Sequence, residues 1–172
     1  MRWFDRDWAL GVTADMSKAL RGLLDNPDFR SALAWRRGLF KAGVAIIREG
    51  QQADAVHVIL QGKVRVLGTV ELDGDKKMRP GLSDLGEGEV FGELCLFDHQ
   101  PRSASVVALT DCELAVIERD ALLAFLDAHP EVGYAVLKEL VQSLVDRLRQ
   151  GNRRVSALMA WGLKAHHMDN VL

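Results

Sequence analysis

The spacing of apolar residues changes twice along the chain and divides it into three regions. Residues 1–40 have apolar positions at helical spacing, interrupted at Asn26-Pro27. They predict an N-terminal helical segment whose second helix continues to about Arg37. Residues 41–118 contain short runs typical of strands, and residues 119–172 return to helical spacing. The pattern therefore predicts a central β domain with helices before and after it.

The central region contains six short runs typical of strands, separated by glycine or acidic turns. These runs are Val44–Ile47, Ala55–Leu60, Val64–Val70, Arg79–Leu85, Ser103–Ala108 and Cys112–Ile117. Many short strands at such spacing predict an antiparallel barrel or sandwich, and no strand–helix alternation of the parallel type is present. The run VHVILQGKVRV, residues 56–66, predicts a hairpin that turns at Gln61-Gly62.

The last region predicts two helices. Arg119–Ala128 forms the first, and His129-Pro130 ends it and starts the next. The second helix carries an apolar stripe at steps of four and three residues, made by Leu137, Val141, Leu144, Leu148, Val155 and Leu158. This rhythm predicts a homodimer seam over residues 137–158, although the helix could also pack only on its own domain. Gly151-Asn152 is expected to end or kink the helix.

Composition excludes several classes of function. The 172 residues carry a formal net charge of −2, which argues against a chain-wide nucleic-acid or anionic-membrane footprint. No apolar run approaches the ~20 residues that span a bilayer, so no membrane partner is expected. Cys95 and Cys112 lie in apolar surroundings without a CxxC spacing, and we expect buried, reduced thiols in a cytoplasmic protein. His166-His167 is a lone pair, so neither a metal site nor a cofactor is expected.

The stretch FGELCLFDHQPRSASV, residues 91–106, places Glu93 and Arg102 as lone charges in apolar surroundings. An unpaired charge near a core is costly, so either the two pair with each other or a ligand lies between them. The planar donor fork of Arg102 suits a phosphate, to which the Ser103 hydroxyl and the Ala104 amide could add further bonds. An ionised Glu93 only accepts hydrogen bonds, and a ribose hydroxyl would supply a donor. Neighbouring glycines and a short helical turn near Glu93 favour the ligand.

Two stretches carry a resemblance to a known family. GEVFGELCLFDHQPRSASV, residues 88–106, resembles the phosphate-binding cassette of cyclic-nucleotide-binding domains. FKAGVAIIREGQQADAVHVILQGKVRV, residues 40–66, resembles the opening strands of these domains, and the likeness covers roughly residues 20–150. The sensor domain of catabolite-activator-like proteins is the nearest type. The resemblance implies an α+β fold, an antiparallel double-stranded β-helix or jelly-roll-like β-roll flanked by N-terminal and C-terminal helices.

The resemblance also implies a binding site. Its ligand-binding residues would be Phe91, Gly92, Glu93, Leu94, Cys95, Arg102, Ser103 and Ala104. In the family, the glycine and glutamate hold the ribose 2′-hydroxyl and the arginine bonds the cyclic phosphate. A serine after the arginine, rather than a threonine, favours cAMP over cGMP. Candidates for contact with the base are Val64, Val90, Val106 and Arg147, although the valines could equally belong to the core and the arginine could simply be solvated.

The function predicted from these features is a regulatory module that binds cAMP, or cGMP, and transmits binding to its C-terminal helices and an unidentified effector. One alternative is a scaffold in which the two charges pair; another is the sensor part of a catabolite-activator-like transcription regulator. We expect no enzyme, because no nucleophile lies in a recognisable setting. The residues after Arg154 predict no helix-turn-helix domain and no direct DNA contact. The cluster Arg147, Arg149, Arg153 and Arg154 is expected to be a solvated helix surface.

Overall fold

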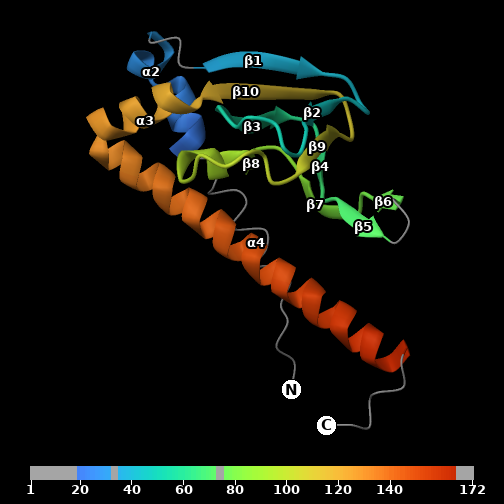
Figure 1. Ribbon diagram of the computed structural model, residues 1–172. Coiled ribbons are helices and arrows are strands. Elements are labelled where there is room, and N and C mark those ends of the chain that lie inside the picture. Colours follow the sequence, from blue (N-terminus) through green and yellow to red (C-terminus); the bar gives the residue numbers. More distant parts are fainter. Residues whose placement is uncertain (1–18, 32–34, 73–75, 166–172) are drawn as a thin grey trace, which may run out of the picture.

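A computed structural model describes residues 19–31, 35–72 and 76–165. Two four-stranded antiparallel sheets form a roll, with strand orders β1-β10-β3-β8 and β2-β9-β4-β7, and a two-stranded ribbon, β5-β6, lies at one end (Figure 1). The strands are β1 Trp35–Phe40, β2 Ala45–Ile47, β3 Ala55–Gln61, β4 Val64–Leu67, β5 Val70–Leu72, β6 Lys76–Met78, β7 Gly81–Leu85, β8 Val90–Phe91, β9 Ser105–Ala108 and β10 Cys112–Glu118. The expected α+β roll is confirmed.

Helices precede and follow the strands of the roll along the chain. Residues 19–25 are helical and α2 spans Pro27–Ser31; the 3₁₀ turn η1 (Glu93–Leu96) lies within the roll. After β10 come α3 (Arg119–Ala128) and α4 (Pro130–Ala165). Most of the expected N-terminal segment and His166-His167 lie outside the described residues. None of the described helices combines the length and apolar composition needed to cross a membrane.

The expected helix up to Arg37 is wrong at its end, because Trp35–Phe40 forms the edge strand β1. This strand pairs with β10 along its whole length, from Trp35 opposite Ile117 to Phe40 opposite Cys112. Pairing with a strand far along the chain, which local spacing does not report, overrides the helical pattern here. The β-roll therefore includes residues 35–40 that the sequence assigned to the helical segment.

The expected hairpin across Gln61-Gly62 is also wrong, although the turn itself is present. β3 pairs with β10 and β8, whereas β4 pairs with β9 and β7, so the turn carries the chain from one sheet to the other. Gly62 has a φ of 99°, and a Cβ there would lie 2.6 Å from the Asp111 carbonyl oxygen. Glycine is therefore required at this corner for both conformation and space.

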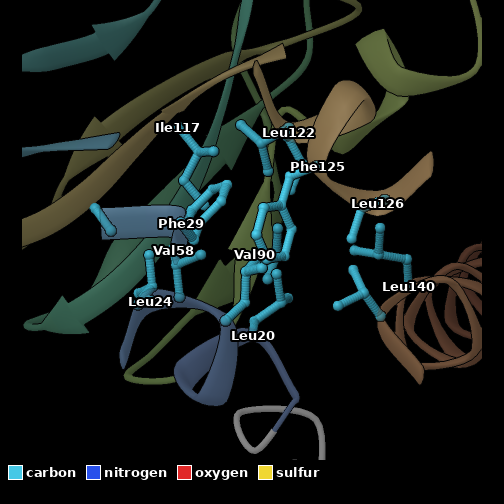
Figure 2. Close-up of a cluster of buried hydrophobic side chains, with 14 of the residues drawn as sticks. Leu20, Leu24, Phe29, Val58, Val90, Ile117, Leu122, Phe125, Leu126 and Leu140 are labelled. Carbon is cyan, nitrogen blue, oxygen red and sulfur yellow. The ribbon is translucent and has the colours of Figure 1, made fainter. Parts of the chain in front are cut away.

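Two groups of buried side chains hold the fold together. One lies between the first sheet and the helices and includes Leu20, Phe29, Val58 and Leu140 (Figure 2). The other fills the inside of the roll and consists of Ile47, Ile59, Val64, Leu85, Phe91, Val106, Ala108, Cys112 and Leu114. Because Phe91 belongs to the inner group and leads directly into η1, the position of that turn is fixed by packing inside the roll.

Helix α4 has two different halves. Near its start Val136 and Leu140 are buried at 0% and 1% exposure, and they attach the helix to the body. From residue 148 nearly every side chain is exposed, and the helix extends beyond the roll (Figure 1). The expectation that the helix ends at Gly151-Asn152 is wrong, because α4 continues to Ala165. One exposed glycine costs only about 1 kcal/mol relative to alanine, too little to stop a long helix.

Candidate functional site

A sharp backbone turn places Glu93 at the start of η1. Strand β8 ends at Phe91, Gly92 adopts φ 75°, and η1 begins at Glu93. The short helical turn expected near Glu93 is therefore present. A Cβ on Gly92 would lie 2.5 Å from Nη1 of Arg102 and 3.2 Å from the carbonyl oxygen of Ala55. The absent side chain thus lets the arginine approach the backbone of the turn.

Hydrogen bonds from both its backbone and its side chain hold Arg102 in place within the protein. Its backbone N–H donates to the Gln51 carbonyl at 2.8 Å, and its own carbonyl accepts from Gly50 at 2.8 Å. Its guanidinium donates to the carbonyl of Gly92 at 3.0 Å and to that of Ala55 at 2.7 Å, and the residue is only 9% exposed. A guanidinium has five N–H donors, so further donors remain for an anion in a fixed orientation.

Glu93 and Arg102 do not pair with each other among the described contacts. The buried Glu93 carboxylate instead accepts a hydrogen bond from Nη1 of Arg147 on α4, with 2.6 Å between nitrogen and oxygen. A second donor of Arg147 bonds the carbonyl of Val90. The expectation of a merely solvated Arg147 is therefore wrong, because its side chain is 26% exposed and joins the long helix to the acid of the turn.

A cavity of about 230 Å³ lies beside these groups. All eight ligand-binding residues expected from the sequence line it, namely Phe91, Gly92, Glu93, Leu94, Cys95, Arg102, Ser103 and Ala104. Of the base-contact candidates, Val106 and Arg147 line the cavity. Val64 and Val90 do not, because both are fully buried in the core groups. The cavity therefore combines a charged end with an apolar wall.

Several lining residues were missed from the sequence: Ile47, Ala53, Val66, Asp98, Gln100, Pro101 and Leu144. Strand periodicity could have found Val66, which lies two residues after the candidate Val64 and so shares its face of β4. Asp98 and Gln100 lie in the turn between the two key charges. Leu144 belongs to the apolar stripe of α4, and only the path of that helix brings it to the cavity.

Comparison with known proteins shows the family of the domain that contains the cavity. The model of the family described as "Cyclic nucleotide-binding domain" matches residues 38–129, from β1 to the end of α3. This chain belongs to the cyclic nucleotide-binding domain family. Leu144 and Arg147 lie on α4, beyond the matched residues.

Relatives of the domain include bacterial regulators. The cyclic AMP receptor protein of Thermus thermophilus is 35% identical over 124 residues, 72% of this chain and 54% of the relative. The CRP-like cAMP-activated global transcriptional regulator of Mycobacterium tuberculosis is 31% identical over 120 residues, 70% of this chain and 50% of the relative. The chain thus spans about half the length of these curated relatives.

Among solved structures, a cyclic nucleotide-binding domain from Methylobacillus flagellatus KT is similar, with a TM-score of 0.65 and 31% identity. The similarity covers 72% of this chain and 67% of the other. The Thermus thermophilus catabolite activator protein gives a TM-score of 0.59 at 31% identity, over 78% of this chain and 60% of the other. The resemblance stated from the cassette residues is therefore confirmed.

Two uncharged groups lie at the candidate site, His57 behind the cavity wall and Cys95 in the wall itself. His57 on β3 stacks on Phe91 with 4.9 Å between ring centroids, so it is a core histidine. Burial, followed by the charges of Arg102 and Arg36, lowers its pKa to about 4, so the ring is neutral near pH 7. Burial also raises the pKa of the Cys95 thiol.

Both cysteines are buried and free, as expected. Over the described ranges no group of three or more histidine, cysteine, aspartate or glutamate side chains is arranged to hold a metal ion. The polar side chains that line the cavity are those of Glu93, Asp98, Gln100, Arg102, Ser103 and Arg147.

Proposed function

We propose that the domain binds cAMP in this cavity and that binding changes the placement of α4. The observation that carries the proposal is the pair of oppositely charged groups at the cavity wall. Arg102 faces it as a fixed donor for a phosphate, and Glu93 as an acceptor for a sugar hydroxyl. The names of the relatives, a cyclic AMP receptor and a cAMP-activated regulator, support cAMP as the first ligand to test. Ser103 after the arginine supports the same choice.

The ion pair between Glu93 and Arg147 supports the proposed link to α4. A ribose hydroxyl donating to the Glu93 carboxylate would share or compete for the acceptor that now holds Arg147. A ligand shifts a conformational equilibrium only when it contacts the two states differently. Here the contact would differ with the position of Arg147, so a change at the sugar would become a change in how the long helix is held.

We further propose that two copies pair through residues 137–158 of α4. The apolar stripe of this helix stays exposed in the single chain, with Leu148 at 64%, Val155 at 50% and Leu158 at 68% exposure. These positions follow the heptad rhythm of a helix seam, which a partner helix would cover. Leu144 belongs to the same stripe and lines the cavity, so pairing and ligand binding would share one stretch of the helix.

The scaffold alternative predicts that Glu93 and Arg102 are paired, whereas in the structure both side chains bond other groups. The proposal therefore stays with a regulatory, non-catalytic module. Its cytoplasmic location, its effector and the absence of DNA contact remain predictions.

Calorimetric titration with cAMP and with cGMP tests the proposal. Saturable binding of cAMP to one site per chain, tighter than that of cGMP, is the expected result. Tighter binding of cGMP would keep the site and correct the ligand, whereas no heat with either nucleotide would overturn the proposed function.

A further inference from the structure

His57 lies directly behind the cavity wall. It faces Phe91 in the register between β3 and β8, and the two rings stack with an angle of 9° between their planes. Phe91 lines the cavity one residue before Gly92. Two residues before His57 on β3, the backbone carbonyl of Ala55 accepts a hydrogen bond from the guanidinium of Arg102. One short stretch of β3 thus supports both the aromatic and the cationic part of the site.

The imidazole of His57 has an unusual property for a buried group. The residue is 6% exposed, and its Nδ1 has no hydrogen-bond partner among the groups that the structure describes. Burying a polar atom in this way is unfavourable, and a phenylalanine could make the same ring stack without this cost. The property that histidine adds at this position is its capacity to take up a proton.

The groups around His57 decide when that proton binds. Arg102, next to the cavity, and Arg36, on the edge strand β1, are the two charges that disfavour the imidazolium. The neighbouring residues in register, Val116 of β10 and Phe91 of β8, are uncharged. Burial and the two arginines keep the pKa of the imidazole low, at about 4. A negative charge placed on Arg102 would offset the larger of the two unfavourable charge effects.

We propose that His57 is a positioning residue whose protonation is coupled to the binding of an anionic phosphate at Arg102. The inference rests on the proposed function, because the phosphate is that of the cyclic nucleotide. The phosphate offsets the charge of Arg102, so the imidazole behind Phe91 binds a proton more readily in the complex than in the free protein. By linkage, the same proton strengthens nucleotide binding, and affinity gains through His57 as the pH falls below about 6.

Proton uptake on binding is the direct measurement. Titrations of the full chain with cAMP at about pH 5, in two buffers of different ionisation enthalpy, give the number of protons taken up per nucleotide. The wild-type protein is expected to take up about 0.2–0.5 proton, and His57→Phe close to none. The ratio of wild-type to His57→Phe affinity should rise about 1.3- to twofold between pH 7.5 and 5. A role in ring stacking alone would move neither quantity.

Two matched variants exclude other histidines. His99 lies in the turn beside the cavity, and His129 also stacks on a phenylalanine, Phe125, but far from the cassette in the sequence. His99→Gln and His129→Phe should both keep the wild-type proton uptake. Equal uptake by wild-type and His57→Phe protein would overturn the inference while leaving the proposed function intact. Absence of cAMP binding at pH 7.5 in the wild-type protein would overturn both.

Discussion

The guanidinium of Arg147 lies 2.6 Å from the carboxylate of Glu93, although the two residues are 54 positions apart in the chain. This ion pair joins the last helix to the turn that carries the acid of the site. Because Glu93 is 4% exposed, the pair is shielded from water on one side, unlike an ordinary surface pair. A change in the contacts of the Glu93 carboxylate would therefore change the contacts of Arg147.

The strength of this pair follows from a double-mutant cycle of Glu93→Gln and Arg147→Gln. We expect a coupling of about 1–3 kcal/mol in the free energy of unfolding, measured by urea denaturation. The control pair is on the same helix: Arg149 and Asp146 lie 3.8 Å apart with the arginine 64% exposed, and their cycle should give close to zero. Equal coupling energies in the two cycles would contradict a stabilising ion pair between Glu93 and Arg147.

Arg102→Ala is expected to weaken cAMP binding by about 2–4 kcal/mol, since the phosphate would lose a fixed, charged donor. The measurement is calorimetric titration at neutral pH. Arg65→Ala provides the control, because Arg65 bonds Asp84 on the surface at 2.6 Å and does not line the cavity. Since Arg102 also holds two carbonyls, Arg102→Lys and a thermal unfolding curve separate lost binding from lost folding. Unchanged affinity in a folded Arg102→Ala protein would exclude the site.

Gly92→Ala should destabilise the protein and weaken binding, because the new Cβ would overlap the guanidinium of Arg102 at 2.5 Å. Gly43→Ala is a matched control: its φ is 83°, similar to the 75° of Gly92, but a Cβ added there would meet nothing within 4 Å. The left-handed conformation alone costs about 1–2 kcal/mol, so Gly43→Ala should lose that much and Gly92→Ala at least about 1 kcal/mol more. Denaturant unfolding measures the free energy of unfolding of both variants. An equal loss of stability in Gly92→Ala and Gly43→Ala would contradict the overlap with Arg102.

The stability of the protein should depend on pH through His57. Its pKa is about 4 in the folded state against an ordinary value of 6.5, so between these values the unfolded chain binds more protons than the folded one. The free energy of unfolding therefore falls as the pH is lowered, by about 2 kcal/mol from pH 7 to pH 5 through this residue. Denaturant unfolding at both pH values should show a smaller loss in His57→Phe. An identical loss in both proteins would refute the assignment.

The proposed seam on α4 predicts that Val155→Glu separates two paired chains, because a carboxylate would be buried between the helices. Sedimentation analysis should show a wild-type dimer and a Val155→Glu monomer. Gln150→Glu, one residue before Gly151 and off the apolar stripe, adds the same charge and should leave the dimer intact. A wild-type protein that stays monomeric at high concentration would rule out the seam.

The cassette could be predicted from the sequence because its parts are close together in the chain. Glu93 and Arg102 are nine positions apart, and the turn between them brings both to one cavity. The residue types indicate the chemistry of the site: Glu93 is an acceptor, Arg102 is a planar donor, and Gly92 lies where the backbone must turn. Ser103 and Ala104 directly follow Arg102 and could be assigned to the cavity for the same reason, whereas Phe91 was implied by the resemblance to the family.

Predictions failed where a partner comes from far along the chain. The strand at Trp35–Phe40 exists because β10 pairs with it, and the strands on either side of Gly62 belong to different sheets because other strands pair with each of them. The local spacing of apolar residues shows which side chains a segment can bury. Strand pairing depends on which distant segments of the chain lie next to it.

By itself, the sequence determined the class of fold, the charged ends of the site and the apolar stripe of the last helix, since periodicity and residue chemistry are local properties. Only the tertiary structure decided that Arg147 holds Glu93, that His57 lies behind Phe91 and that Val64 is core rather than cavity wall. Those facts depend on where α4 and the two sheets are packed, and packing is a property of the whole chain rather than of any segment.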